Sequence, residues 1–443
     1  MLQSLRVKPK DWSGLPPTFE VLAVRMRQCA HSEIRDPDRS RDLMRFLLYS
    51  HDGMGLGHVR RNLAVAAAIT ELDRDSAVLL ATGVDLGYGL RLPEGLDTLK
   101  LPALRKVTNG AYESRSLPVT AEQIIGLRSA LLTTAVESFE PDVMLVDKHP
   151  LGVGGELRGA LGALRRSAGV AVLGLRDILD EPTVVLQEWQ AHDTARVIDE
   201  HYDRVLVYGR RSVFDPLREY DLPKSVGDRT TFCGYVTSSS ASRPGRAGDP
   251  EGLAEESDRQ LVLATAGGGE DGFALLNTFI ATAAVAPWHG VVVAGPSATG
   301  DERSSLQARA EDAGVDFHSY VPDLSRWFRS VHALVCMGGY NSLTEATSTG
   351  TPTVCVPRVH PRAEQRIRAQ GFARLGLLRT IDPRELEPVV LAHEVTTVMG
   401  TPRAELQARA HAVLGFGGAR RAADELVALA RNHPADRART RSA

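Results

Sequence analysis

The stretch Leu334–Ala346, with the sequence LVCMGGYNSLTEA, decides the fold. Its apolar first residues predict a buried parallel strand, because a strand covered on both faces needs no alternation of polar side chains. Gly338 and Gly339 allow a sharp turn of the backbone, and Asn341 or Ser342 can cap a helix that follows. This pattern predicts an anion site at the start of the helix, where N–H groups are unpaired and the helix dipole is positive.

A second turn of the same kind lies earlier in the chain. It follows the apolar run Leu261–Thr265, where Gly267, Gly268 and Gly269 precede another predicted helix. In the first motif, Glu345 lies one turn into the helix, close enough to reach a group attached to a bound anion. Two anion-binding turns in one α/β segment predict a nucleoside diphosphate that carries a further group as the ligand.

Strands alternate with helices along most of the chain, which predicts parallel, doubly wound sheets of the α/β class. In the first half, the expected strands are 45–50, 77–82, 143–146, 170–175 and 205–208, with helices near 59–72, 120–139, 155–168 and 183–200. Residues 84–118 are expected to be irregular. In the second half, the expected strands are 261–265, 291–294, 315–318, 333–337 and 353–356, followed by a helical stretch at 403–431 with a break near Gly415–Gly418.

Composition divides the chain into five segments. The expected segments are an N-terminal extension that could be disordered (1–43), a Rossmann-like domain (44–236), a linker (237–258), a second domain with both glycine turns (259–431) and a disordered tail (432–443). The linker is rich in Ser, Gly and Pro, and the tail is polar. The last helix of the second domain could return to the first. Two such domains predict a cleft at the carboxyl ends of their strands.

The composition also narrows the classes of partner. Of 443 residues, 24% are charged and 5% are aromatic, and the net charge is −3, which does not fit a nucleic-acid-binding protein. Four cysteines are scattered without paired spacing, which fits a reducing cytoplasm. No apolar run reaches transmembrane length, and the N-terminus lacks a signal-peptide core. The expected location is the cytoplasm, with peripheral membrane contact left open.

The first expected strand is followed by the glycine-rich turn Gly53–His58. Its spacing approaches that of a dinucleotide fingerprint, but His58 occupies the place of the last glycine. The second strand also ends without the acidic residue that would bind the ribose of the dinucleotide. Both departures argue against a nicotinamide enzyme.

Four features of the chain together resemble the signature of GT-B glycosyltransferases of family 28. The four are Gly53–His58, Gly267–Gly269, Gly338–Glu345 and Pro357–Gln365, and their order and spacing extend from about residue 44 to 366. The resemblance implies two Rossmann-like domains facing a cleft, with the acceptor on the first and a nucleotide-sugar donor on the second. Met337 departs from plant-type natural-product transferases, which have a histidine on the diphosphate at this position, so more of this contact must come from backbone N–H groups.

The resemblance also implies which residues bind the donor. Gly267, Gly268, Gly339, Asn341 and Ser342 would cradle the diphosphate. Glu345 would hold the ribose, the main chain near Tyr320 and Val321 would meet the base, and Glu364 and Gln365 would bind the sugar. Glu364 stands where relatives carry Asp or Gln, which leaves the sugar open. The full set of implied donor-binding residues is Gly55, Gly57, Gly267, Gly268, Gly269, Val321, Gly338, Gly339, Asn341, Ser342, Glu345, Glu364 and Gln365.

The catalytic base implied by the resemblance is His58, because histidine titrates near neutral pH. His51 is a rival base or an acceptor contact. Asp147 and His149 follow a buried strand and should point into the same cleft, where they could bind the acceptor or orient His58. Glu156 and Asp177 also lie at strand ends, and we interpret them as ordinary caps or ion-pair partners.

The implied function is that of an inverting glycosyltransferase, which moves a hexosyl group from a nucleoside-diphosphate sugar, most simply UDP-linked, to an acceptor hydroxyl. No Asp-x-Asp pair follows an apolar strand, so the reaction is expected to be metal-independent, and no cofactor is expected because the nucleotide sugar is a substrate. The alternatives are a UDP-sugar hydrolase or 2-epimerase on the same fold, and a non-catalytic nucleotide-sugar sensor or partner subunit. The acceptor is open: a small molecule, a glycan or a lipid-linked sugar, chosen by residues 84–118.

Overall fold

The structure is a computed structural model, and it describes residues 43–51, 57–85, 92–108, 111–237, 259–269 and 271–432. The structural statements below concern these residues. Several predictions lie outside them: the N-terminal extension up to residue 42, residues 238–258 of the linker, the tail after residue 432, and Gly55 of the first glycine turn.

The described residues form a first, seven-stranded sheet in the order β3-β2-β1-β6-β7-β8-β9, with all neighbours parallel. The chain order reverses between β1 and β6, so the crevice at the carboxyl ends of these two strands is the expected ligand position in such a sheet. The strands are β1 (Arg45–Ser50), β2 (Ala77–Thr82), β3 (Leu96–Lys100), β6 (Val143–Asp147), β7 (Val170–Arg176), β8 (Arg204–Tyr208) and β9 (Thr230–Phe232).

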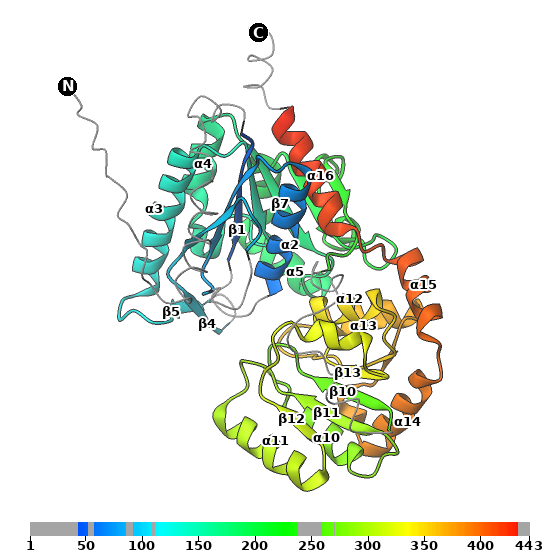
Figure 1. Cartoon of the computed structure of the whole chain (residues 1–443). Helices are drawn as coiled ribbons and strands as arrows, with labels where there is room; N and C mark the ends of the chain where they lie inside the picture. Colours follow the sequence, from blue (N-terminus) through cyan, green and yellow to red (C-terminus); the bar gives the residue numbers. More distant parts are fainter. Residues whose placement is uncertain are drawn as a thin grey trace, which may run out of the picture. The chain divides into compact units, whose positions relative to one another are not determined.

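Helices cover both faces of this sheet, because successive side chains of each strand point to opposite faces. In β1, Phe46 and Leu48 pack with α2 (Gly57–Leu72), whereas Leu47 and Tyr49 pack with α3 (Ala121–Phe139) and α4 (Arg158–Arg166). Figure 1 shows α2 and α16 (Gly418–Arg431) on one face and α3 and α4 on the other. The remaining helices of this half are α5 (Pro182–His192), α6 (Thr194–His201), α7 (Pro216–Glu219), α8 (Lys224–Gly227) and a 3₁₀ turn (Val153–Gly155).

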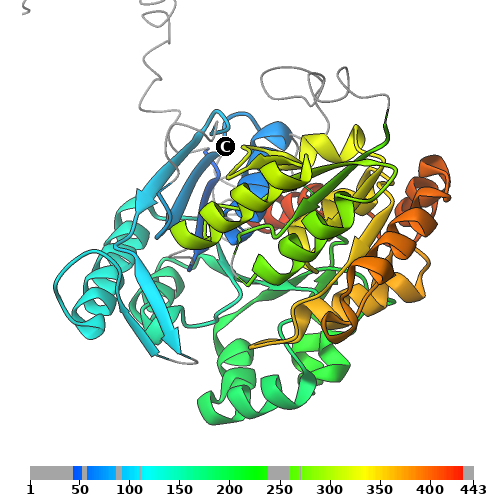
Figure 2. The ribbon, with the colours of Figure 1, turned by 90° about the horizontal axis from the view of Figure 1, so that it is seen from below.

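The prediction that residues 84–118 are irregular is wrong in part. β3 pairs with β2 inside the sheet, and β4 (Leu104–Thr108) pairs with β5 (Ala111–Ser114) as an antiparallel hairpin. The hairpin lies beside α3 (Figure 2). β3 escaped prediction because it is an edge strand of sequence LDTLK without a buried apolar run. The single helix expected at 183–200 is two helices, separated at Asp193, whose φ is +50°.

The second sheet has six parallel strands in the order β12-β11-β10-β13-β14-β15 among the described residues. Its chain order reverses between β10 and β13, the two strands that precede the glycine turns. α10, α11 and α14 pack on one face, and α12 and α13 on the other. The strands are β10 (Leu261–Thr265), β11 (His289–Val293), β12 (Asp316–His318), β13 (Ala333–Cys336), β14 (Thr353–Cys355) and β15 (Arg379–Thr380).

The helices of the second half follow the predicted alternation. They are α10 (Phe273–Ala283), α11 (Gly300–Ala313), α12 (Tyr340–Ser348), α13 (Glu364–Arg374), α14 (Pro388–Met399) and α15 (Arg403–Val413), with 3₁₀ turns at Leu324–Arg329 and Pro383–Glu385. The predicted break near residues 415–418 is confirmed, because α15 ends at Val413 and α16 (Gly418–Arg431) begins after it.

The last helix returns to the first sheet. α16 packs against α2, and its buried side chains include Ala422, Leu426 and Val427. Backbone hydrogen bonds hold the segment that leads into α16 against the first half. Tyr235 N donates to Gly415 O at 2.8 Å, and Gly418 N donates to Tyr235 O at 3.1 Å. The segments that leave and re-enter the first half are therefore paired with each other.

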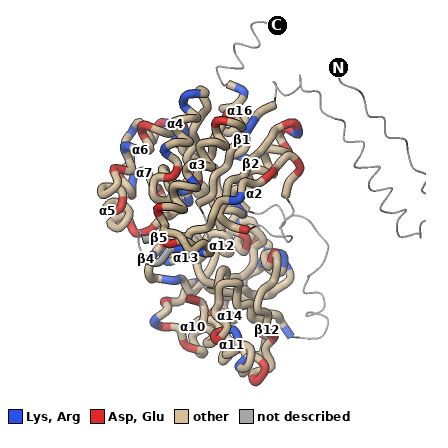
Figure 3. The backbone as a smooth tube through the Cα atoms, turned by 90° about the vertical axis from the view of Figure 1, so that its left-hand side faces the viewer, with Lys and Arg blue, Asp and Glu red and all other residues tan. Residues whose placement is uncertain are grey.

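Charged residues of both signs are interspersed along the backbone of both halves (Figure 3). Within the described residues, no helix combines the length and the apolar character that crossing a membrane requires.

Candidate functional site

A cavity of about 590 Å³ lies at the carboxyl ends of the central strands, lined by residues of both sheets. From the first half it is lined by Gly57, His58 and Arg61 at the start of α2, and by Arg176 at the end of β7. From the second half, the turns after β10 and β13 line it. The two points of reversed strand order therefore open into one pocket, as the topology of doubly wound sheets leads one to expect.

The turn after β13 reaches the cavity through Gly339, Asn341, Ser342 and Glu345. α12 begins at Tyr340 with Gly339 as its N-cap, and no side chain caps it. The prediction that Asn341 or Ser342 caps this helix is therefore wrong: both lie inside the first turn, where helical geometry leaves their side chains to face the cavity. The free N–H groups at this end are consequently available to a ligand.

Gly338 is required by close packing rather than by ligand contact. A Cβ at this position would come within 2.6 Å of the carbonyl oxygen of Gln365. Gly338 does not itself line the cavity, whereas its neighbours Met337 and Gly339 do. The glycine thus brings the turn after β13 against the start of α13.

The turn after β10 contributes Gly267 and Gly268 to the cavity. Gly267 has a φ of +67°, and its N–H donates to Oγ1 of Thr265 at 3.1 Å. Gly269 is not among the lining residues. It has a φ of +96°, and a Cβ there would lie 2.8 Å from the nitrogen of Ala298, so its role is to pack this turn against the next one.

The structure separates the two residues predicted to bind the sugar. Gln365 lines the cavity, as do Tyr320 and Val321 at the predicted position of the base. Glu364 is not a lining residue: it is buried and pairs with Arg358 at 3.1 Å. Adjacent residues at the start of a helix point in different directions, which accounts for the difference.

His58 lies at the second position of α2 and lines the cavity. Its Nδ1 is 3.1 Å from Oδ2 of Asp147, at the end of β6, and 2.8 Å from Nη2 of Arg61. Arg61 also donates to the same Asp147 oxygen at 2.5 Å. Burial lowers the pKa of His58 well below its ordinary value, and the charges of Arg61 and Arg176 lower it further. His58 is therefore a neutral imidazole at pH 7.

The other two predicted histidines lie behind His58 rather than on the cavity wall. The ring of His51 packs edge to face against His58 and against His149, with centroid distances of 4.6 Å in both pairs. Burial lowers the pKa of His51 well below its ordinary value. The structure thus brings His51, His58, Asp147 and His149 into one cluster, but only His58 is among the residues that line the cavity.

Sequence reasoning singled out none of the four arginines that line the cavity, Arg60, Arg61, Arg115 and Arg176, although two of them had a signal in the sequence. Arg61 lies three residues after His58, so both face the same side of α2, a spacing that the sequence displays. Arg176 is the last residue of β7, and a cation directly after a buried apolar run is the corresponding signal.

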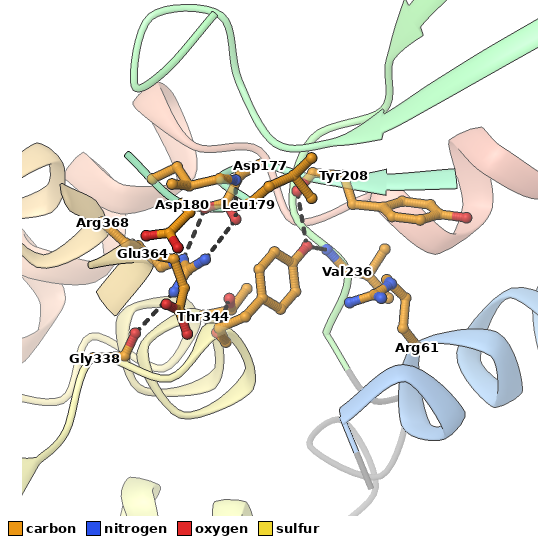
Figure 4. A network of polar contacts seen from close by, with 12 residues as sticks. Arg61, Asp177, Leu179, Asp180, Tyr208, Val236, Gly338, Thr344, Glu364 and Arg368 are labelled. Atoms are coloured by element: carbon orange, nitrogen blue, oxygen red, sulfur yellow. Dashed lines mark hydrogen bonds and ion pairs between the residues drawn. The ribbon is translucent and has the colours of Figure 1, made fainter. Parts of the chain in front are cut away.

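Asp177 and Glu156 each form an ion pair with an arginine, in agreement with their interpretation from the sequence. Glu156 pairs with buried Arg128. Asp177 accepts two hydrogen bonds of 2.8 Å from Arg368 of α13, and Arg368 also donates to Gly338 O at 2.9 Å. Figure 4 shows Arg368 between Asp177 of the first half and Gly338 of the second. The turn after β13 is therefore tied to the end of β7 through one buried guanidinium.

Comparison with known proteins shows what the second half of the chain resembles. Residues 268–426 match the glycosyltransferase family 28 C-terminal domain. This part of the chain is therefore similar to a family 28 domain. One relative is the UDP-N-acetylglucosamine–N-acetylmuramyl-(pentapeptide) pyrophosphoryl-undecaprenol N-acetylglucosamine transferase of Nocardia farcinica. The two sequences are 27% identical over a stretch that covers 84% of this chain and 92% of the relative. The protein of the same name from Corynebacterium efficiens is 29% identical over 33% of this chain. The aligned part spans 39% of that relative's length.

A solved structure shows that the likeness in fold extends beyond the family 28 domain. The glycosyltransferase of kitacinnamycin covers 87% of this chain and 98% of its own, with a TM-score of 0.57 and 19% identity. The predicted GT-B fold is therefore confirmed. Gly268, Gly339, Glu345 and Gln365 lie within the family 28 domain, whereas His58 and Arg176 belong to the half that precedes it.

Proposed function

We propose that the protein is a metal-independent, inverting glycosyltransferase that moves a hexosyl group from a nucleoside-diphosphate sugar to an acceptor hydroxyl. One observation carries this proposal: His58, with buried Asp147 at its Nδ1, lines the same cavity as Gly339 and Glu345 of the family 28 domain. A base and an anion-binding helix start thus share one pocket, the arrangement that displacement of a diphosphate requires.

The donor side of the proposal rests on the two turns of the second half. The N–H groups of the first turn of α12, together with Gly267 and Gly268, would hold the diphosphate, and Glu345 would accept hydrogen bonds from the ribose hydroxyls. The cavity volume of about 590 Å³ is in the range of small-molecule sites. UDP is the nucleotide we propose, because it is the one in the printed names of the relatives from Nocardia and Corynebacterium.

The catalytic side rests on the tautomer of His58. The proposal requires the tautomer with the proton on Nδ1, directed to Oδ2 of Asp147 at 3.1 Å, so that Nε2 is the atom that would accept a proton. Arg61 Nη2, 2.8 Å from the same Nδ1, can donate only to the other tautomer, so the balance between these two contacts decides whether the base is ready. The acceptor oxygen would attack C1 of the sugar as its proton passes to Nε2, and the bond from C1 to the diphosphate would break with the electron pair leaving on the diphosphate. A single displacement inverts the configuration at C1. Metal independence follows from the absence of an Asp-x-Asp pair after an apolar strand of the sequence.

The acceptor would be held by the first half. Val84, Asp85 and Arg115 line the cavity and flank the segment that contains β3 and the hairpin β4–β5. This segment would set acceptor choice, because segments that follow strand ends line the pocket and vary most readily.

The first prediction concerns H58A. Its turnover should fall about 10²- to 10⁴-fold, because proton transfer to the imidazole is lost, while donor binding stays unchanged. Binding is measured by the thermal shift with a panel of UDP sugars, and turnover by UDP release with alcohol, glycan and lipid-linked acceptors. The matched control is H393A, which removes an exposed histidine of α14.

The same measurements test the alternatives. UDP release that needs no acceptor would indicate a hydrolase, and a changed sugar without UDP transfer would indicate an epimerase. A wild-type protein that is stabilised by donors but turns none over, with H58A responding equally, would indicate a sensor. No stabilisation by any nucleoside-diphosphate sugar would refute the proposed function altogether.

A further inference from the structure

We propose that Arg176 forms an anion subsite on the first-sheet wall of the cavity, where its guanidinium binds phosphoryl oxygens of one of the two substrates. The inference rests on the proposed function for the identity of the two substrates. The position of Arg176 in the cavity does not depend on that function. Arg176 is the last residue of β7, and it lines the cavity together with His58. None of the roles implied by the resemblance to family 28 includes it.

Arg176 lacks the partners that a buried arginine ordinarily has. Its Nε–H is buried and has no hydrogen-bond acceptor among the described residues. No ion pair among these residues includes its guanidinium, although five N–H groups of an arginine can donate. Arg176 as a residue is half-buried and lines the cavity, so an anion in the cavity would pair with a charge that no described residue neutralises.

The charged groups around Arg176 are already engaged with one another. Arg61 pairs with Asp147 at 2.5 Å, Arg368 with Asp177 at 2.8 Å, and Arg358 with Glu364 at 3.1 Å. Arg368 and Arg61 act on Arg176 as like charges, and burial together with Arg368 lowers its pKa. Glu364 and Asp177 act on Arg176 in the opposite direction, but the Glu364 carboxylate is bonded to Arg358 and the Asp177 carboxylate to Arg368. The charge of Arg176 therefore remains for a ligand.

The cavity as a whole has the charge that such a ligand needs. Among its described lining residues, four are arginines (Arg60, Arg61, Arg115 and Arg176) and two are acidic (Asp85 and Glu345). A guanidinium matches phosphoryl oxygens with two parallel hydrogen bonds, which a lysine cannot do. Phosphoryl oxygens could come from the diphosphate of the donor or from a phosphorylated acceptor, and the experiment below distinguishes these sources.

The test is isothermal titration of the wild-type protein and R176Q with UDP, uridine and inorganic pyrophosphate. Loss of one charge-assisted contact should weaken pyrophosphate binding about 10- to 100-fold, and R176K should be intermediate because it keeps the charge without the fork. The matched control is R158Q, which changes an exposed arginine at the start of α4 that does not line the cavity. Thermal unfolding shows whether each variant is folded.

Each outcome decides something. Weaker binding of UDP but not of uridine by R176Q assigns the subsite to the donor diphosphate. The subsite belongs to the acceptor if two results are found together. R176Q binds UDP as the wild type does, and pyrophosphate binds to the UDP-saturated wild type but not to UDP-saturated R176Q. Pyrophosphate binding that R176Q leaves unchanged, or that the wild type lacks, overturns the inference. If R176Q does not fold, R176K decides by the same criteria. Pyrophosphate binding through Arg176 without affinity for any nucleoside diphosphate would refute the proposed function but keep the subsite.

Discussion

The surroundings of His58 combine groups that are distant in sequence. Arg61 follows it on α2, Asp147 ends β6, and His51 follows β1. Asp147 can act on His58 in two opposite ways, because its Oδ2 lies 3.1 Å from Nδ1 and also pairs with Arg61, whose positive charge opposes protonation of the imidazole. The balance between these charges, rather than the histidine alone, sets the pH at which the base works.

We therefore predict that the acidic limb of kcat/KM lies below pH 6.5. The base must be neutral, and burial and Arg61 lower the pKa of His58, so activity is lost only as the pH falls through this lowered value. In R61Q the positive neighbour is removed and Asp147 is left negative, so the pKa rises and the limb moves to higher pH. The measurement is the pH–rate profile, with R74Q, an exposed position near the end of α2, as the control.

If the acidic limb of the pH–rate profile lies at the same pH in R61Q as in the wild type, a group other than His58 titrates. A lower kcat alone would not support the prediction, because loss of packing by Arg61 against the rings of Tyr208 and Tyr340 could cause it.

At the scale of single residues, the sequence indicated those whose position follows from a strand end. His58, Asp147, Asn341 and Glu345 follow apolar runs, so their common edge could be predicted. Arg176 could not be assigned a ligand from sequence. What distinguishes it is that no described residue forms an ion pair with it, and this is visible only in the folded structure. Glu364 was placed on the sugar, but the structure pairs it with Arg358 instead.

At the scale of elements, buried strands were predictable, whereas three of the four edge strands of the two larger sheets were not; the exception is β12, expected at 315–318 and found at Asp316–His318. β1, β2 and β10 have the predicted bounds, because each is a continuous apolar run. β3, β9 and β15 were not predicted, because they are short or partly exposed edge strands whose place depends on pairing with a neighbour.

The element-scale prediction concerns the contact between β13 and α13. G338A should destabilise the protein by about 1–3 kcal/mol, because its Cβ would lie 2.6 Å from the carbonyl oxygen of Gln365 and force two backbones apart. Donor binding should weaken as well, since the shift displaces Gly339 and Gln365 on the cavity wall. Urea unfolding and UDP titration measure the two effects.

The control is G126A in α3, where a Cβ meets nothing within 4 Å. It should stabilise the protein by up to about 1 kcal/mol, because alanine is the better helix former. Equal stability of G338A and wild type would contradict the interpretation of the close contact.

At the scale of the whole molecule, the two sheets share buried polar contacts. Tyr340, the first residue of α12, donates its hydroxyl to Tyr208 O at 3.1 Å and accepts from Val236 N at 3.0 Å. Arg368 and Asp177 add a second connection next to it. An apolar cluster also contains side chains of both sheets, including Tyr208, Tyr235 and Phe372. These contacts join the end of the first sheet directly to the start of α12.

We predict strong coupling between Asp177 and Arg368. Either D177N or R368M should cost about 3–5 kcal/mol of unfolding free energy, because each leaves a buried charge without its partner. The double variant should lose less than the sum of the single losses, and a double-mutant cycle in urea measures the difference. D228N, which breaks the exposed pair with Lys224, should change little. Additive losses would mean that the two side chains act independently.

The position of α16 has a consequence for synthesis on the ribosome. The side chains that this helix buries, among them Ala422, Leu426 and Val427, belong to the last described turns of the chain, yet they pack on α2, which is translated near the beginning. During translation, the apolar side of α2 that they cover therefore stays open to solvent, or to a chaperone, until the chain has emerged as far as α16. The half that carries His58 is thus begun before the second half and completed only after it.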